Sequence, residues 1–378
     1  MTADPPLAGL RVLEFLGLGP GPFAGMMLAD LGADVVAIAR PGTPRPALAE
    51  NRPVLEVDLK DERGAELVQR LTDQADVLVE GFRPGVMERA GLGPAPLLAR
   101  NPGLVYARMT GWGQTGPLAA RAGHDINYIA LTGALHHAAR RGTAPAPPAN
   151  LLGDFGAGGL YLVASVLAAV HERHRTGRGQ VIDAAVVDGT TYLTSMLHEY
   201  RSRGTWSDEA GTNRLDTGAP YYDVYECADG QYVAIGALED KFFTELAELL
   251  GLDRTWTERR HDTESWPELR RLTAQAVRQR TRDEWARAAE GTDACLTPVL
   301  SLGEAAGHGH MRARDILIPA PPGQDGWRPR LTGRPAPASA GTDDTLRRWG
   351  VERAAVPHTS PGPDHHERHE QHKEGSSR

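Results

Sequence analysis

Residues 10–39 read LRVLEFLGLGPGPFAGMMLADLGADVVAIA. Two short apolar segments, residues 10–15 and 34–39, flank a Gly/Pro loop and a helical segment at residues 23–31. Near-continuous apolar strands separated by helices are typical of a parallel sheet that is covered on both faces. The stretch therefore predicts the first strand–helix–strand unit of an α/β fold.

The alternation continues through the first half of the chain. The pattern predicts helices at residues 62–72, 158–174 and 190–203, and strands at 76–80, 105–109 and 180–186. We assign residues 1–203 to one large domain with a parallel sheet.

The pattern changes after residue 203. Residues 204–220 are polar and predict a linker, and residues 221–318 predict a smaller α+β domain. Its first part shows two strands around a turn at Asp229-Gly230, and helices are expected at 241–250, 268–280 and 282–290. Residues 319–354 are taken as a segment that returns to the large domain, and residues 355–378 as a disordered His-rich tail.

The tail contains five of the fourteen histidines: His358, His365, His366, His369 and His372. Histidines are common metal ligands, but these form no closed ligand set with a fold around it. A disordered segment rich in Pro, His, Glu and Ser explains them better, so we expect no metal site.

The bulk composition narrows the function. The formal net charge of −8 over 378 residues argues against a general nucleic-acid binder. Cys227 and Cys295 are the only cysteines, so no disulfide framework is implied and a reducing compartment fits. The first residues lack a secretory pattern, and the longest apolar stretch, residues 157–170, is too short to span a bilayer. We expect a cytoplasmic protein that does not bind membranes.

A histidine and an aspartate are each set among glycines. His124 lies in RAGHDINY and Asp154 in NLLGDFG, about a helix length later. Such a pair can remove and return one proton on opposite faces of a carbon. A lone histidine is by default a core residue, but the polar neighbours Asp125, Asn127 and Tyr128 weaken that explanation.

Asp154 directly precedes a predicted helix start in the residues GAGGLYLV. The unpaired N–H groups of a first helical turn can hold a developing oxyanion, so we expect the amides near Phe155 and Gly156 to do so. Aspartate is also a common N-cap, and both roles are compatible because a capping carboxylate lies beside the same amides.

Two further features lie where the predicted strands end. The loop GLGPGP at residues 17–22 lacks a dinucleotide fingerprint, because prolines stand where N–H groups would grip phosphate. It is either a tight turn or a loop that lines a ligand cleft. Arg40, Arg83 and Arg89 can clamp phosphates, although taken alone each is explained by a solvated charge.

Five segments occur in order: LAGLRVLE from residue 7, LGADVV from 31, ARMTGWGQTGP from 107, GHDINY from 123 and GDF from 153. Together they resemble the family III CoA-transferase superfamily, and most of all its α-methylacyl-CoA racemase branch. The resemblance covers residues 7–318. It implies a Rossmann-like large domain, a small α+β domain and two ring-like subunits interlocked as a homodimer.

The resemblance also implies roles for individual residues. It places the catalytic aspartate on Asp154, the racemase histidine on His124 and its supporting glutamate on Glu239, although Glu239 could simply begin the next helix. It places CoA-binding arginines on Arg40 and Arg89.

Beside the histidine, we expect Asp125 and Tyr128 to contact the CoA moiety. CoA enters as part of an acyl-CoA thioester substrate, and no other cofactor is required. Transferases typically have a glycine-rich loop where this chain has GALEDK from residue 236, which favours a racemase.

Three hypotheses remain open. In a racemase, His124 and Asp154 would exchange one proton through an enolate, and burial would have to raise the pKa of Asp154 from about 3.9. In a CoA-transferase, Asp154 would attack an acyl-CoA and become an aspartyl-CoA thioester. The third hypothesis is a protein that binds acyl-CoA without catalysis. The presence of His124, Asp154 and Glu239 together argues against it.

Overall fold

The computed structural model describes residues 4–320, 325–330 and 342–351. The described residues form two compact units: those within Met1–Ala122, Asp154–Asp188 and Arg334–Arg378 make the first, and those within Gly123–Gly153 and Gly189–Gly333 the second. This division differs from a large domain at residues 1–203.

Interactions within the second unit explain the difference. Arg140 forms an ion pair with Asp223, and Arg141 pairs with Glu209. Residues 123–153 are therefore attached to the segment that the sequence analysis treated as a linker and small domain.

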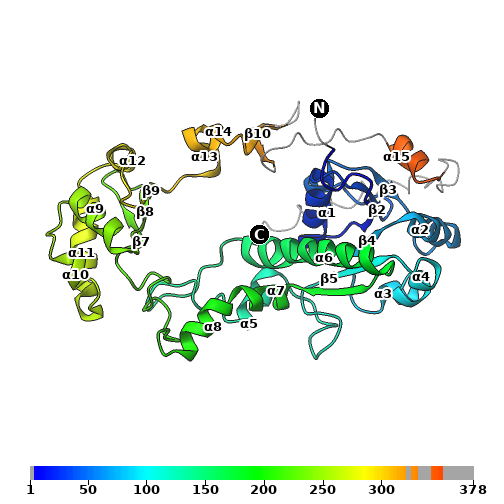
Figure 1. The fold of residues 1–378 in the computed structure, drawn as a ribbon, viewed down its shortest axis with the longest axis horizontal. Coiled ribbons are helices and arrows are strands. Elements are labelled where there is room, and N and C mark those ends of the chain that lie inside the picture. The colour runs from blue at the N-terminus through cyan, green and yellow to red at the C-terminus, as the bar shows by residue number, and fades with distance from the viewer. Residues whose placement is uncertain (1–3, 321–324, 331–341, 352–378) are drawn as a thin grey trace, which may run out of the picture. The chain divides into compact units, whose positions relative to one another are not determined.

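The first unit is built on a six-stranded parallel sheet in the order β3-β2-β1-β4-β5-β6 (Figure 1). Its strands are β1 (Arg11–Phe15), β2 (Asp34–Ala39), β3 (Val54–Glu56), β4 (Val77–Glu80), β5 (Val105–Thr110) and β6 (Val181–Ala185). The predicted α/β fold with a parallel sheet is confirmed. The strand order reverses between β1 and β4, and ligands of such sheets bind at the carboxyl ends of the strands near that reversal.

Helices cover both faces of this sheet. They are α1 (Pro20–Asp30), η1 (Ala47–Ala49), α2 (Glu62–Gln74), α3 (Val86–Arg89), α4 (Pro94–Arg100), η2 (Leu151–Leu160), α6 (Tyr161–Thr176) and α15 (Thr342–Arg348). One face packs on α2, α3, α4 and α15 through a buried cluster that includes Leu13, Leu67, Leu78 and Trp349. The other face packs on α1 and α6.

The helix formed by η2 and α6 is longer than the apolar stretch in the sequence suggests. It runs from Leu151 to Thr176, and by length and hydropathy alone it could cross a membrane. The prediction that the longest apolar segment is too short to span a bilayer is therefore wrong. A core helix meets the same criteria, and α6 packs on β5, β6 and α1 (Figure 1).

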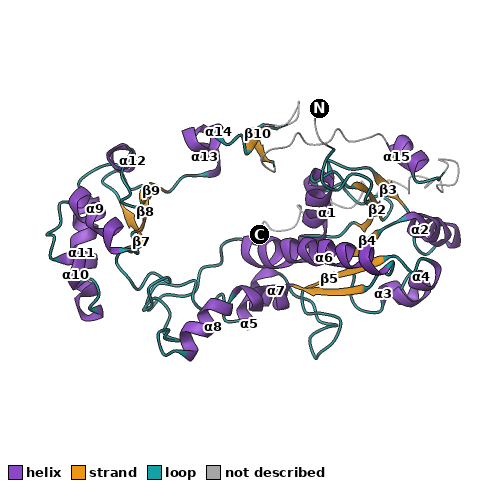
Figure 2. Ribbon diagram, viewed as in Figure 1, coloured by secondary structure: helices purple, strands orange, loops and turns teal. Residues whose placement is uncertain are grey.

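The second unit contains an antiparallel sheet in the order β7-β8-β9, beside the helices α9, α11 and α12 (Figure 2). The helix α7 (Val186–Leu193) carries the chain into this unit. The strands here are β7 (Tyr222–Glu226), β8 (Tyr232–Gly236), β9 (Leu296–Pro298), β10 (Leu317–Pro319) and β11 (Trp327–Pro329). The helices are α5 (Asp125–Leu131), α8 (Ser195–Ser202), α9 (Asp240–Leu250), α10 (Trp256–Arg259), η3 (Thr263–Ser265), α11 (Trp266–Val277), α12 (Arg282–Ala289), α13 (Leu302–Gly307) and α14 (Gly309–Ala313). The predicted strand pair around Asp229-Gly230 is the β7–β8 hairpin.

Candidate active site

A cavity of about 640 Å³ opens at the carboxyl edge of the parallel sheet. It is lined by residues that follow or end β1, β2, β3 and β4, and by α3: Phe15, Leu16, Ile38, Ala39, Arg40, Thr43, Val57, Asp58, Leu59, Lys60, Phe82, Val86, Arg89 and Ala90. The volume falls in the range of small-molecule and cofactor sites. This position is the one expected for a ligand of a doubly wound fold.

Three cations line this cavity. Arg40 and Arg89, which the sequence predicted, are joined there by Lys60. Among the described residues, no ion pair joins any of the three to a carboxylate, and Asp58 is the one acidic side chain in the lining. The cavity therefore combines apolar walls with cations that can bind phosphate groups.

A buried ionic network supports two walls of the cavity. Arg108 on β5 donates from Nε to Glu80 at 2.8 Å and from Nη1 to Glu88 at 2.7 Å. Glu80 in turn accepts from the backbone N–H of Phe82 at 2.7 Å. Because Glu88 lies beside Arg89 on α3, Arg108 links the positions of Phe82 and Arg89.

The two glutamates of this network are shifted in opposite directions. Burial raises the pKa of Glu80 by more than the Phe82 amide and Arg108 lower it. Glu88 is largely exposed, and its hydrogen bond with Arg108 lowers its pKa. Arg108 thus joins a solvent-facing carboxylate to a buried one.

Asp154 lies against the loop between β1 and α1. A Cβ atom added to Gly19 would be only 2.9 Å from Oδ2 of Asp154. The GLGPGP loop therefore contacts the residue that the sequence analysis predicted as the catalytic aspartate.

The predicted helix start after Asp154 is wrong. The ten residues of η2 form a π-helix that continues directly into α6, and Asp154 lies in its first turn. Two glycines of this helix are closely packed, Gly153 against Asp125 and Gly159 against Phe23.

This correction also affects the expected oxyanion site. Phe155 and Gly156 lie inside the π-helix rather than at its beginning. N–H groups within a π-helix face carbonyl groups one turn earlier. The reason for expecting these two amides to be available to a thioester oxygen is therefore removed.

His124 precedes α5 as its N-cap residue. Its backbone N–H donates to Oδ1 of Asn127 at 3.1 Å. Asp125, the first residue of the helix, is buried against Gly153, and the Tyr128 hydroxyl donates to the Gly123 carbonyl. The structure thus brings His124, Asp125 and Tyr128 together on one short helix of the second unit.

Glu239 is the N-cap residue of α9, as its position before a helix suggested. Within the described part of the chain, no hydrogen bond joins the side chains of His124 and Glu239, although both belong to the second unit. Their interaction stays a prediction. Asp154 belongs to the first unit, together with Arg40 and Arg89.

Among the described residues, no three His, Cys, Asp or Glu side chains are grouped so that they could hold a metal ion. The five histidines between His358 and His372 lie outside the described residues.

Residues 7–348 match the model of CoA-transferase family III, and the chain belongs to this family. The chain is 45% identical to the α-methylacyl-CoA racemase of Mus musculus over 354 residues, which cover 92% of each chain. It is 44% identical to the α-methylacyl-CoA racemase of Homo sapiens over 314 residues, or 82% of each chain.

A more distant relative has a solved structure. The chain is 33% identical to the probable fatty acyl-CoA transferase Rv3272 of Mycobacterium tuberculosis, over 78% of this chain and 84% of that one. A crystal structure of Rv3272 superposes with a TM-score of 0.72 at 30% identity, covering 88% of this chain and 94% of that chain. The predicted resemblance to the family and to its racemase branch is confirmed.

Sequence reasoning missed Lys60 and the network around Arg108. Lys60 follows β3, a strand of three residues that is too short to show a pattern. Glu80 and Arg108 are charged residues within apolar strands, and a charge at such a position signals a buried partner.

Proposed function

We propose that this chain is a racemase that interconverts (R)- and (S)-2-methylacyl-CoA thioesters by moving one proton through an enolate. The observation that carries the proposal is the identity of 44–45% to two proteins named α-methylacyl-CoA racemase. Rv3272, which is named a probable fatty acyl-CoA transferase, is 33% identical. His124, Asp154 and Glu239 supply the side chains that the chemistry needs.

The cavity at the carboxyl edge of the sheet would hold the nucleotide part of CoA. Arg40, Lys60 and Arg89 would bind its phosphate groups, since cations without a carboxylate partner can form charge-assisted hydrogen bonds with a ligand. The apolar lining around Phe15 and Phe82 would contact the adenine ring. This binding leaves the thioester end of the substrate for the catalytic residues.

The reaction requires two groups that exchange protons. His124 removes the α-proton of one enantiomer, and protonated Asp154 delivers a proton to the opposite face of the enolate. For the other enantiomer the two roles are reversed. Proton transfer of this kind needs no metal or redox cofactor.

We also propose that the protein acts as a homodimer. Leu131, Tyr192 and Leu193 are more than half exposed in the single chain, and Met196 is nearly so. Exposed apolar groups of this size are typical of surfaces that a partner covers. Glu239, to which the resemblance assigns the support of the catalytic histidine, would orient His124.

Incubation of the purified protein with an (S)-2-methylacyl-CoA in D₂O, without any acceptor acid, tests the function. We expect α-deuterium uptake with loss of optical purity, and we expect His124→Ala to abolish the inversion. Light scattering on the same sample measures whether the protein is dimeric.

An absence of uptake in the wild type would contradict the racemase proposal. If free carboxylic acids then exchanged CoA with the substrate, and His124→Ala left this exchange intact, the protein would be a CoA-transferase. Tight binding of acyl-CoA with neither reaction would indicate a binding protein.

A further inference from the structure

The first turn of α1 has an unusual sequence, Gly19-Pro20-Gly21-Pro22-Phe23. Pro20 and Pro22 each fix φ near its helical value, so this turn has little conformational freedom. Gly19, the N-cap, has φ +68° and ψ −119°, a backbone conformation that other residues rarely adopt. The turn is therefore rigid, and its first residue must be glycine.

Gly19 lies directly against the carboxylate of Asp154. A Cβ atom at residue 19 would be 2.9 Å from Oδ2, 3.3 Å from Cγ and 3.7 Å from Oδ1 of Asp154. The first of these distances is shorter than carbon–oxygen contacts allow, so the carboxylate would have to move. The absence of a side chain at residue 19 thus defines the space that the Asp154 carboxylate occupies.

One turn later, Phe23 fixes the helix that carries Asp154. Its ring stacks on Phe155, with centroids 4.9 Å apart and an interplanar angle of 25°. A Cβ at Gly159 would be 2.5 Å from the Phe23 ring and 3.3 Å from the Pro20 carbonyl oxygen. Phe23 therefore packs closely against two residues of η2 that are four positions apart.

The π-helical winding of η2 makes this packing relevant to Asp154. A π-helix is rare and persists where its surroundings stabilise it. Gly19 contacts Asp154, and Phe23 contacts Phe155 and Gly159. The first turn of α1 thus contacts η2 both at Asp154 and at the residues that follow it, as far as Gly159.

We propose that the Gly19–Phe23 turn is a rigid template that positions the Asp154 carboxylate, with Gly19, Phe23 and Phe155 as positioning residues. The inference rests on the proposed function for its kinetic consequence. It assigns a role to the GLGPGP motif, which lacks the fingerprint of a dinucleotide-binding loop.

Gly19→Ala tests the proposal, and Gly21→Ala is its matched control. Both variants add one methyl group to the same turn, but a Cβ at Gly21 has no atom within 4 Å. We expect Gly19→Ala to slow racemisation by about 100-fold, because a misplacement of the order of 1 Å has that effect on an enzyme. Gly21→Ala should stay within about twofold of the wild type.

Deuterium uptake by each pure enantiomer separates a displaced Asp154 from a general defect. In Gly19→Ala, the enantiomer whose proton is taken by His124 should still exchange it, without inversion. The enantiomer that needs Asp154 as the base should lose exchange. An equal loss for both enantiomers, or activity like that of Gly21→Ala, would overturn the proposal.

An alanine at residue 19 would have to adopt a φ of +68°, which strains its backbone, so a second variant tests the proposal without that strain. Phe155→Leu introduces no strain and removes only the ring stack; it should shift the ratio of the two exchange rates in the same direction, and Phe155→Tyr should restore it. An unchanged ratio in Phe155→Leu would contradict the role of Phe155.

Crystal structures of the wild type and Gly19→Ala distinguish failure of this inference from failure of the proposed function. A wild type without deuterium uptake would contradict the racemase function alone. A carboxylate of Asp154 that is displaced in Gly19→Ala would still support the template, and one that keeps its wild-type position would refute it.

Discussion

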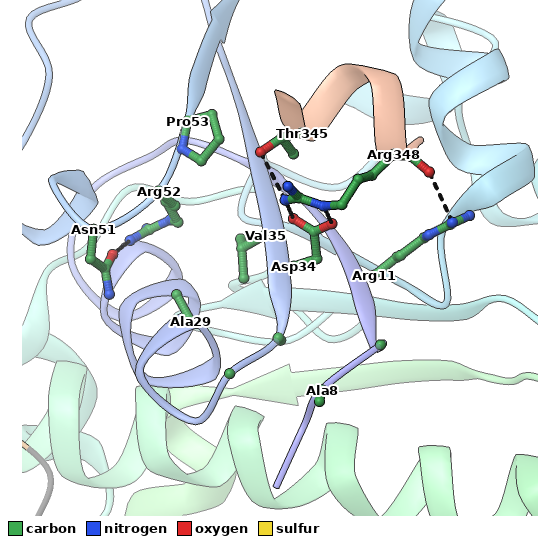
Figure 3. A pocket seen from close by; sticks show the side chains of 13 residues that line it. Ala8, Arg11, Ala29, Asp34, Val35, Asn51, Arg52, Pro53, Thr345 and Arg348 are labelled. Atoms are coloured by element: carbon green, nitrogen blue, oxygen red, sulfur yellow. Dashed lines mark hydrogen bonds and ion pairs between the residues drawn. The ribbon is translucent and has the colours of Figure 1, made fainter. Parts of the chain in front are cut away.

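The two edges of the parallel sheet use charged side chains in different ways. At the carboxyl edge, Arg40, Lys60 and Arg89 line a cavity of about 640 Å³ with no carboxylate paired to them among the described residues. At the amino edge a second cavity, of about 400 Å³, is lined by Arg11, Asp34 and Arg348 among others (Figure 3).

The charges at the amino edge bind one another. Arg348 donates to both carboxylate oxygens of Asp34, at 3.1 and 2.9 Å, and Arg11 donates to the Arg348 carbonyl (Figure 3). Trp349 also donates to Asp34, at 3.1 Å, and its ring is buried in the core of the first unit. These interactions attach α15 to the start of β1 and β2.

A cavity lined by arginines is therefore not by itself an anion site. At the amino edge, cations that already have protein partners hold α15 in place. At the carboxyl edge, cations without a carboxylate partner among the described residues can bind a ligand. Variants at the two edges should accordingly differ in what they change, stability at one edge and ligand binding at the other.

Trp349→Ala should have the largest effect, on stability. Removing a fully buried tryptophan leaves a cavity, and we expect the free energy of unfolding to fall by about 3–5 kcal/mol. Arg347→Ala, an exposed position on the same helix, is the control. Denaturant titration measures the change; a Trp349→Ala protein as stable as the control would mean that α15 contributes no packing.

Arg40→Ala and Arg89→Ala should weaken CoA binding without a comparable loss of stability. A hydrogen bond to a charged group contributes about 1.5–3 kcal/mol, so each variant should raise Kd roughly 10- to 100-fold. Calorimetric titration with CoA measures this effect. Arg348→Gln at the amino edge should bind CoA like the wild type, and a matching loss there would remove the distinction between the edges.

Glu88→Gln should weaken CoA binding by a smaller factor, because Glu88 contacts Arg108 rather than the ligand. Because the Glu88 side chain is nearly half exposed, its ion pair with Arg108 contributes up to about 1 kcal/mol, which corresponds to a rise in Kd of roughly fivefold or less. The same titration provides the measurement. A loss as large as that of Arg89→Ala would indicate that Glu88 itself contacts CoA.

The ion pair between Arg108 and Glu88 also gives the stability of the protein a weak dependence on pH. Arg108 lowers the pKa of Glu88 below its ordinary value of 4.5, so the folded protein binds fewer protons there than the unfolded chain. The contribution of this ion pair to the free energy of unfolding is fully present above pH 4.5, the ordinary pKa of Glu88. It is lost as the pH falls through the lower pKa that Glu88 has in the folded protein. Unfolding measured between about pH 3 and 7 should show a shallower acid loss in Glu88→Gln than in the wild type.

Much of the fold could be predicted because its signals are local. The apolar runs at β1, β2, β4, β5 and β6 each gave a strand, and their separation by helices required a parallel sheet. The short strand β3 was missed because three residues carry no periodic pattern. The helix was predicted to start only after Asp154, although it begins at Leu151 and its Gly153 and Gly159 pack closely against other segments.

For the candidate site, the residue types could be read from the sequence, because ordered motifs and ionisable side chains are visible along a chain. The motifs predicted His124 and Asp154 as the groups that exchange a proton, and the resemblance to the family assigned Glu239 to orient His124 and Arg40 and Arg89 to bind CoA. Which cations share a cavity, and which charges already have partners, became apparent only from the folded chain. The tertiary structure also decided that Asp154 lies in a π-helix against Gly19, because such contacts join segments more than 100 residues apart and depend on packing that no local pattern records.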